Sequence, residues 1–287
     1  MNQPMNRRER AESFRALHHA PGGFLLPCAW DAASARLFEA AGFRAVGTTS
    51  AGIAYARGRR DGQRVSRDEM LREVASIVAA VAIPVSADVE AGYGDRPEDV
   101  ARTVRGALNA GAAGINLEDG TGRPGAPLYT VEDQQRRLAA ARSAARAAGL
   151  PLVINARTDT YLTGPGPDDR ERYGETVRRG RAYLEAGADV VFVPGLVHPP
   201  TVGALVRDLE GRVSLMAMPG APSVPELLGL GVRRVSTGPG AMLAAMGTVA
   251  AVARELSEHG TYRMIERSFY GPGEAEALFT PPPAGTP

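Results

Sequence analysis

Two acidic residues, separated by one residue, follow a short apolar stretch in the first third of the chain. Asp88 and Glu90 lie in Ser86-Ala-Asp-Val-Glu-Ala-Gly-Tyr-Gly, directly after Ile83-Pro-Val. Because alternate side chains of a strand share a face, both carboxylates should project into the space at that strand's end. A hard cation would relieve their repulsion, and oxygen ligands suit Mg2+, or Mn2+, better than zinc. A lone Asp-x-Glu is also typical of a solvated loop, so the surrounding sequence must distinguish a metal site from a loop.

Further polar residues follow other apolar stretches in the same way. Arg157 offers a planar fork for a substrate carboxylate, and Ser50 with the amides of Ala51 and Gly52 could hold a carboxylate or enolate oxygen. Taken singly, each has an ordinary explanation as a cap, an ion pair or a turn. Taken together, buried acids need a metal or paired cations. The set comprises Thr48 to Gly52, Asp61, Asp88, Glu90, Glu118, Asp119, Asn155, Arg157, Asp159 and Ser236 to Gly240.

The elements that would position these residues alternate regularly along the chain. Short apolar stretches, expected as strands, lie at 24–27, 45–49, 84–88, 114–118, 152–157, 190–194, 213–217 and 234–236. Helical patterns lie at 31–41, 68–80, 97–110, 131–148, 171–186, 199–209, 223–230 and 239–257. Eight such units predict an α/β protein with a (β/α)8 TIM barrel, although a doubly wound sheet alternates similarly. Active sites of such barrels lie at the carboxyl ends of the strands.

The ends of the chain add to this barrel. Residues 6–19 predict an extra helix over the barrel bottom, and residues 260–278 predict a short helix that packs on a partner subunit. We expect one barrel domain over residues 1–275. The proline-rich residues 276–287 are expected to form a disordered tail.

Composition excludes several classes of function. The 287 residues have a net charge of +1, which argues against nucleic acid, and the chain contains neither an 18-residue apolar run nor a signal-peptide pattern. We therefore expect a cytoplasmic protein with no membrane partner. A single cysteine, Cys28, excludes an intrachain disulfide. All 33 basic residues are arginine, so lysine Schiff-base chemistry and a P-loop are excluded as well.

The motifs together resemble the isocitrate lyase and phosphoenolpyruvate mutase superfamily. They are, in family order, Trp30-Asp31-Ala-Ala-Ser-Ala, Thr49-Ser-Ala-Gly52, Asp88-Val-Glu-Ala-Gly-Tyr-Gly, Gly114-Ile-Asn-Leu-Glu-Asp119, Asn155-Ala-Arg-Thr-Asp159 and Glu185-Ala-Gly-Ala-Asp-Val-Val-Phe. The resemblance implies an (α/β)8 barrel, often with its last helix swapped between subunits of a homodimer or homotetramer. It also implies Mg2+-dependent chemistry through the enolate of a 2-oxo acid.

The resemblance also implies roles for single residues. Asp88, Glu90 and Glu118 fall on the metal-binding acids, with Asp88 as the direct ligand and Glu118 acting through water. Asp61 matches a loop acid near metal and substrate, and it joins Arg157 and Glu118 as a catalytic candidate. The implied substrate-binding residues are Trp30, Asp31, Ser50, Ala51, Gly52, Asp88 and Arg157.

The chain departs from the family where lyases carry a Lys-Lys-Cys-Gly-His or Lys-Arg-Cys-Gly-His loop. Residues 120–129 contain no cysteine, histidine or lysine there, and they also lack the lysine and asparagine of the mutases. Pro194, Met216 and Met218 make the expected pocket less polar.

We therefore predict a Mg2+-dependent carbon-carbon lyase, a decarboxylase or a retro-aldol enzyme, acting on a small 2-oxo or 2-hydroxy di-acid. The base for the substrate hydroxyl would be Asp61, Tyr129 or a metal-bound water. The alternatives are a phosphonopyruvate-type C-P hydrolase or mutase, and a non-catalytic barrel that binds a keto acid.

Overall fold

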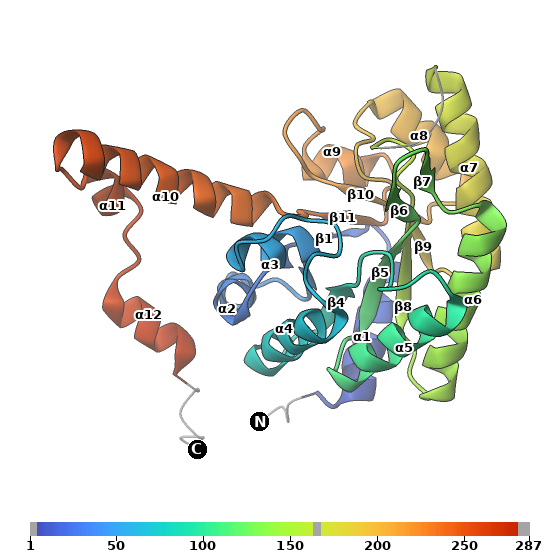
Figure 1. The fold of residues 1–287 in the computed structure, drawn as a ribbon, viewed down its shortest axis with the longest axis horizontal. Helices are drawn as coiled ribbons and strands as arrows, with labels where there is room; N and C mark the ends of the chain where they lie inside the picture. Colours follow the sequence, from blue (N-terminus) through green and yellow to red (C-terminus); the bar gives the residue numbers. More distant parts are fainter. Residues whose placement is uncertain (1–4, 163–167, 281–287) are drawn as a thin grey trace.

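One parallel sheet closes on itself to form the body of the protein (Figure 1). The computed structural model describes residues 5–162 and 168–280. The first strand is divided at Pro27, and its two halves pair with the last strand and with β3, which closes the barrel. In sheet order the strands are β1 (Phe24–Leu26), β11 (Arg234–Ser236), β10 (Val213–Met216), β9 (Val190–Phe192), β8 (Val153–Arg157), β5 (Gly114–Glu118), β4 (Val85–Asp88), β3 (Val46–Thr48) and β2 (Cys28–Ala29). The predicted (β/α)8 barrel is confirmed.

Helices follow the strands at the positions expected from the sequence. Glycines with positive φ, among them Gly42, Gly111, Gly187 and Gly231, come directly after helices, where the left-handed conformation ends the helix. The sequence pattern did not reveal α3, which begins directly after β3. The helices up to the end of the barrel are α2 (Ala32–Ala40), α3 (Ser50–Ala56), α4 (Arg67–Ala80), α5 (Pro97–Asn109), α6 (Val131–Ala147), α7 (Asp169–Glu185), α8 (Pro199–Asp208) and α9 (Val224–Gly229).

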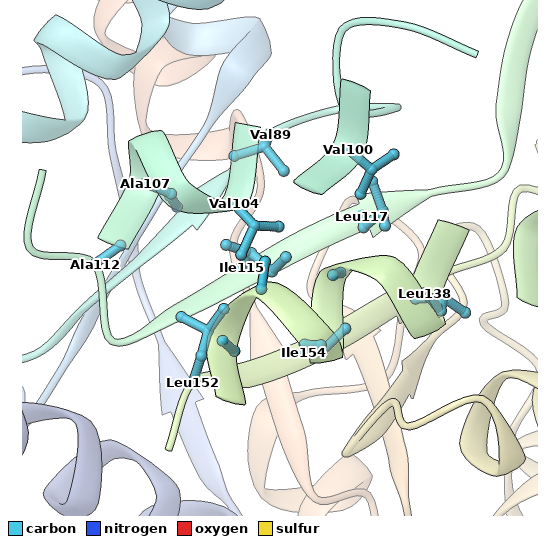
Figure 2. Packing of buried hydrophobic residues seen from close by; sticks show 14 of the residues in the cluster. Val89, Val100, Val104, Ala107, Ala112, Ile115, Leu117, Leu138, Leu152 and Ile154 are labelled. Atoms are coloured by element: carbon cyan, nitrogen blue, oxygen red, sulfur yellow. The ribbon is translucent and has the colours of Figure 1, made fainter. Parts of the chain in front are cut away.

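The main core lies between the outer face of the barrel and the surrounding helices. Figure 2 shows Ile115 and Leu117 of β5 and Ile154 of β8 packed against Val104 of α5 and Leu138 of α6. Strand side chains alternate, so the intervening positions face the barrel interior. Among them, Asn155 Nδ2 donates to Asn116 Oδ1 at 2.7 Å. The same alternation carries Glu118 and Arg157 to the inside at the carboxyl ends of their strands.

The barrel bottom is closed by α1 (Arg7–His19), as predicted. Phe14 and Leu17 are buried against the lowest inward-facing residues of the strands, including Phe24 and Val153. Since this end is filled by apolar side chains, the site must lie at the opposite end of the barrel.

The C-terminal part leaves the barrel as an arm (Figure 1). It consists of α10 (Gly240–His259), α11 (Arg263–Arg267) and α12 (Pro272–Phe279), and none of the residues in these helices is buried. The single helix expected over 260–278 is therefore two helices. The arm returns to the barrel helices through Arg36 Nη2, which donates to the carbonyl of Leu278 at 2.6 Å.

The expected domain boundary at residue 275 falls inside α12, so residues 276–279 are helical. The predicted tail from Pro281 onward lies outside the described residues. Within the described part of the chain, no helix is sufficiently long and apolar to span a membrane.

Candidate active site

Asp88 ends β4 and is held in place by the first turn of α3. Its Oδ2 accepts hydrogen bonds from Ser50 N at 3.0 Å and from Ser50 Oγ at 2.7 Å, and its own amide donates to Thr48 Oγ1 at 2.8 Å. The carboxylate is 8% exposed, yet it lies where the strands open toward solvent. The turn that was expected to bind a substrate oxygen therefore holds a candidate metal ligand through Ser50. For Ala51 and Gly52 the expectation stays a prediction.

Glu90 does not lie on the strand, which corrects the expectation of two acids on one pleated face. β4 ends at Asp88, and Glu90 has a φ of 50°, in the left-handed region. Its carboxylate, 3% exposed, accepts hydrogen bonds from Tyr93 OH at 3.0 Å and from the amide of Gln63. A tight turn, and not strand alternation, brings this acid toward Asp88.

Arg157 and Glu118 face each other across adjacent strands. They are register partners, and Arg157 Nη1 lies 2.9 Å from Glu118 Oε2. The other side of the guanidinium meets Asp159, with Nε to Oδ1 at 2.6 Å and Nη2 to Oδ2 at 3.1 Å. Two carboxylates thus fix the plane of the guanidinium, and each of its three nitrogens has an acidic partner.

The remaining predicted residues lie around this centre. Asp61 is on an exposed loop, where its Oδ1 accepts from the amide of Gly62 at 2.9 Å. Trp30 covers Gly52 so closely that a Cβ there would lie 3.0 Å from Trp30 Cβ. The Asp31 carboxylate caps α2, accepting from Ser34 N and Oγ, each at 2.7 Å. Asp31 Oδ1 therefore has a structural role as the helix cap.

The electrostatics of the site favour a bound cation. Burial raises the pKa of Glu90 to about 7, with Asp88 adding to the effect, and burial also raises the pKa of Glu118 well above its usual range. Loss of hydration and the charge of Asp88 raise the pKa of Asp61, although that residue is exposed. Burial alone would lower the pKa of Arg157, but Glu118 and Asp159 raise it. The single positive charge of Arg157 does not neutralise the negative charges of these carboxylates.

The donor set fits a divalent cation of the Mg2+ type. Among the residues that the structure describes, no three acidic, histidine or cysteine side chains converge into a ready-made cage. Mg2+ usually binds one or two carboxylates and keeps several waters, so Asp88 as a direct ligand, with Glu90 and Glu118 nearby, suffices.

We expect Glu90 to make the metal-free protein less stable as the pH rises. The pKa of Glu90 in the folded protein, about 7, lies above its ordinary value of 4.5, so the folded state binds more protons between these values. Stability should fall by up to about 3 kcal/mol through this window, and a divalent cation should offset the loss. Urea unfolding at pH 5 and pH 8 without divalent cation measures it. Burial lowers the pKa of His18 to about 3, so this group adds stability as the pH rises over part of the same range. The contribution of Glu90 is therefore the difference between the wild type and Glu90→Gln, and a wild type that loses no more stability than Glu90→Gln would contradict the assignment.

A two-stranded hairpin occupies the place of the missing lyase loop. It is formed by β6 (Gly120–Arg123) and β7 (Ala126–Leu128), neither of which was predicted. Just after it, Tyr129 OH donates to Asp95 Oδ1 at 2.5 Å, and Arg123 Nη2 lies 3.2 Å from the same oxygen. Burial and Asp95 raise the pKa of Tyr129. Because its proton is held by Asp95, Tyr129 is a weaker candidate for the base than Asp61.

Comparison with known proteins agrees with this geometry. The family model described as phosphoenolpyruvate phosphomutase matches residues 14–257. An uncharacterized protein of Mycobacterium tuberculosis is 37% identical over 247 residues, which are 86% of this chain and 89% of the relative. A phosphoenolpyruvate phosphomutase of Streptomyces hygroscopicus is 30% identical, covering 86% and 80%. A phosphonopyruvate hydrolase of a Variovorax species is 30% identical, covering 81% of each.

Solved structures show the same likeness in three dimensions. A Burkholderia cenocepacia protein, provisionally assigned as a lyase or mutase, is 40% identical with a TM-score of 0.90, covering 96% of this chain and 97% of that one. A 2,3-dimethylmalate lyase is 27% identical with a TM-score of 0.81 and 94% coverage of each chain. An oxaloacetate acetylhydrolase in complex with oxalate is 25% identical with a TM-score of 0.83 and 93% coverage of each. The chain therefore belongs to the phosphoenolpyruvate mutase family and, with it, to the isocitrate lyase and phosphoenolpyruvate mutase superfamily of enzymes.

Proposed function

We propose that the protein is a Mg2+-dependent carbon-carbon lyase that acts through an enolate on a small 2-oxo or 2-hydroxy di-acid. The observation that carries this proposal is the placement of Asp88, with Glu90 and Glu118, on the same barrel rim as Arg157. Relatives named as 2-methylisocitrate lyase and 2,3-dimethylmalate lyase support the reaction class.

Each group in the site has a separate part in this chemistry. A divalent cation held by Asp88 would supply Lewis-acid polarisation of a 2-oxo carboxylate. Arg157 would bind and orient a carboxylate through its planar fork, while Glu118 and Asp159 keep that fork in position. Asp61 lies on the exposed side, where its carboxyl, with a raised pKa, could take the proton of a substrate hydroxyl.

The mouth of the site favours a substrate smaller or less polar than a tricarboxylate. Pro194 lies just after β9, and β10 ends in Met216, whose sulfur packs so closely against Gly238 that a Cβ at this glycine would clash with it. Met218 is exposed in the next loop. These apolar side chains stand where a polar one would recognise an additional carboxylate, so we expect a di-acid that carries an alkyl group.

Carbon-phosphorus chemistry is the second candidate. It is favoured by the likeness to a phosphonopyruvate hydrolase at 30% identity over 81% of the chain. The hairpin after β5 offers Arg123 as its one cationic side chain, and it lacks the lysine and asparagine that the resemblance to the mutases would require there. We therefore rank this candidate below the lyase.

A substrate panel separates the two candidates. The purified protein is incubated with Mg2+ and, separately, with oxaloacetate-type 2-oxo acids, 2-alkylmalates and phosphonopyruvate, and the products are followed by NMR. Pyruvate released together with CO2 or with a second acid supports the lyase, whereas inorganic phosphate supports the second candidate. Binding without turnover across the whole panel would contradict both.

We further propose that the arm assembles the protein into a homodimer or homotetramer by exchanging α10 between subunits. α10 is 20 residues long, and its apolar side chains at Leu243, Met246, Val249 and Leu256 are 46–67% exposed. Such a stripe on a helix that leaves its own barrel is typical of a protein interface.

Aspartate in this stripe should break the assembly. We expect Met246→Asp/Val249→Asp to lower the molar mass measured by light scattering to that of the monomer, because two charges would be buried in an apolar contact. Thr248→Asp places a single charge on the opposite face of α10 and should leave the mass unchanged. A monomeric wild-type protein would overturn the proposal.

A further inference from the structure

Behind the site lies a fully buried acid with which the proposed chemistry has no contact. Asp119 follows Glu118 and is 0% exposed. Its Oδ1 accepts from the amide of Asp159 at 3.0 Å, and its Oδ2 accepts from Tyr183 OH at 2.7 Å and Arg179 Nη1 at 3.1 Å. Both oxygens therefore accept hydrogen bonds from the loop after β8 and from α7, which fixes the carboxylate in one orientation.

The two α7 residues tie this acid to the hairpin as well. Arg179 and Tyr183 lie one turn apart, and Arg179 Nη1 donates to Tyr183 OH and to the carbonyl of Tyr129, both at 2.9 Å. On its other side, Arg179 Nε pairs with Glu175 at 2.7 Å. In this buried group the charge of Arg179 compensates that of Asp119, and Tyr183 donates a neutral hydrogen bond. We name Asp119, Arg179 and Tyr183 the rear clamp.

The rear clamp acts on the substrate arginine through two successive contacts. Asp119 holds the backbone of Asp159, and the carboxylate of Asp159 grips Arg157 at both Nε and Nη2. The amide of Asp119 also donates to the carbonyl of Arg157 at 3.1 Å. The direction of the Arg157 fork thus depends on where the clamp places Asp159.

The proposed direct metal ligand, Asp88, is held by contacts that lie outside the clamp. Asp88 is oriented by Ser50 and Thr48, which belong to the β3–α3 turn on another part of the rim. A change in the clamp should therefore reach the substrate carboxylate without disturbing the metal ligand.

We propose that Asp119, fixed by Tyr183 and Arg179, is a positioning residue that sets the orientation of Arg157 toward the substrate carboxylate. This inference rests on the proposed function, since it takes Arg157 as the substrate-binding group. If the clamp served stability alone, a change in it would affect metal binding and substrate binding equally. If it orients Arg157, the same change should weaken substrate binding more than metal binding, and this difference can be measured.

Tyr183→Phe tests the proposal, because it removes one hydroxyl without leaving a cavity. The matched control is Tyr173→Phe on the same helix, whose hydroxyl also donates to an aspartate, Asp208, at 2.5 Å but away from the site. Calorimetry measures the binding of Mn2+ alone and then of oxalate, a planar di-acid that resembles an enolate, in the presence of saturating Mn2+. We expect oxalate to bind about 10-fold more weakly to Tyr183→Phe, with Mn2+ affinity unchanged.

The outcomes separate this inference from the proposed function. Wild-type protein that binds neither probe would overturn both. Wild-type binding with Tyr183→Phe equal to Tyr173→Phe would overturn the positioning role alone, as would a parallel loss of Mn2+ and oxalate affinity. Asp119→Asn, if it folds, should weaken oxalate binding at least as much as Tyr183→Phe.

Discussion

Asp88→Asn should abolish metal-dependent turnover and weaken the binding of Mg2+ or Mn2+ about 100-fold. An amide of the same shape keeps its acceptor for Ser50, so the local fold survives, but it removes the anionic oxygen that attracts the cation. Titration of Mn2+ by electron paramagnetic resonance measures the affinity, and product formation by NMR measures the turnover.

The same substitution should not destabilise the metal-free protein. The charge of Asp88 raises the pKa values of Glu90, Glu118 and Asp61, so its removal relieves repulsion among them. Asp189→Asn is a matched control at the other end of the barrel, where Asp189 pairs with Arg142 at 2.5 Å. That variant should keep full metal affinity. Unchanged turnover in Asp88→Asn would refute the site.

Arg157→Lys should lower kcat/KM about 100-fold, equivalent to about 2.7 kcal/mol of transition-state stabilisation. The lysine keeps the charge, yet its single ammonium cannot meet Asp159 at two atoms and Glu118 at a third, as Arg157 does. With the fork lost, the substrate carboxylate would no longer be oriented. Initial rates over a range of substrate concentrations separate the change in KM from that in kcat.

A second arginine provides the control for this substitution. Arg142→Lys removes a guanidinium that bridges Asp189 and the carbonyl of Gly187 at the bottom of the barrel. We expect a modest loss of stability there with kinetics like those of the wild type. Arg157→Met is the harsher change, because Glu118 and Asp159 would lose their common partner, and it should unfold at lower urea concentration than Arg157→Lys. Equal kcat/KM in Arg157→Lys and wild type would remove Arg157 from the substrate site.

Local pattern was sufficient to predict the barrel. Apolar strands that alternate with helices, several of which end at a glycine, predict βα units with little dependence on distant contacts. Since active sites of such barrels lie at the carboxyl ends of the strands, Asp88, Glu118 and Arg157 could be assigned to one rim. The structure places all three there, each as the last residue of its strand.

Other parts of the site depend on contacts that no local pattern reveals. Glu90 reaches the site through a left-handed turn, and Ser50 points at Asp88 because α3 begins at that position. Asp119 looked like a loop acid, yet it is buried beneath partners some sixty residues further along the chain. A hairpin also formed where a loop was expected.

The sequence by itself thus determined which residue types line the rim and which chemistry they could support, because strand periodicity and motif order are local properties. Only the tertiary structure decided how those groups are held. Arg157 gains its orientation from Glu118, Asp159 and the rear clamp, which long-range packing of β5, β8 and α7 brings together. Hydrogen bonds between residues so far apart form only once the barrel has closed.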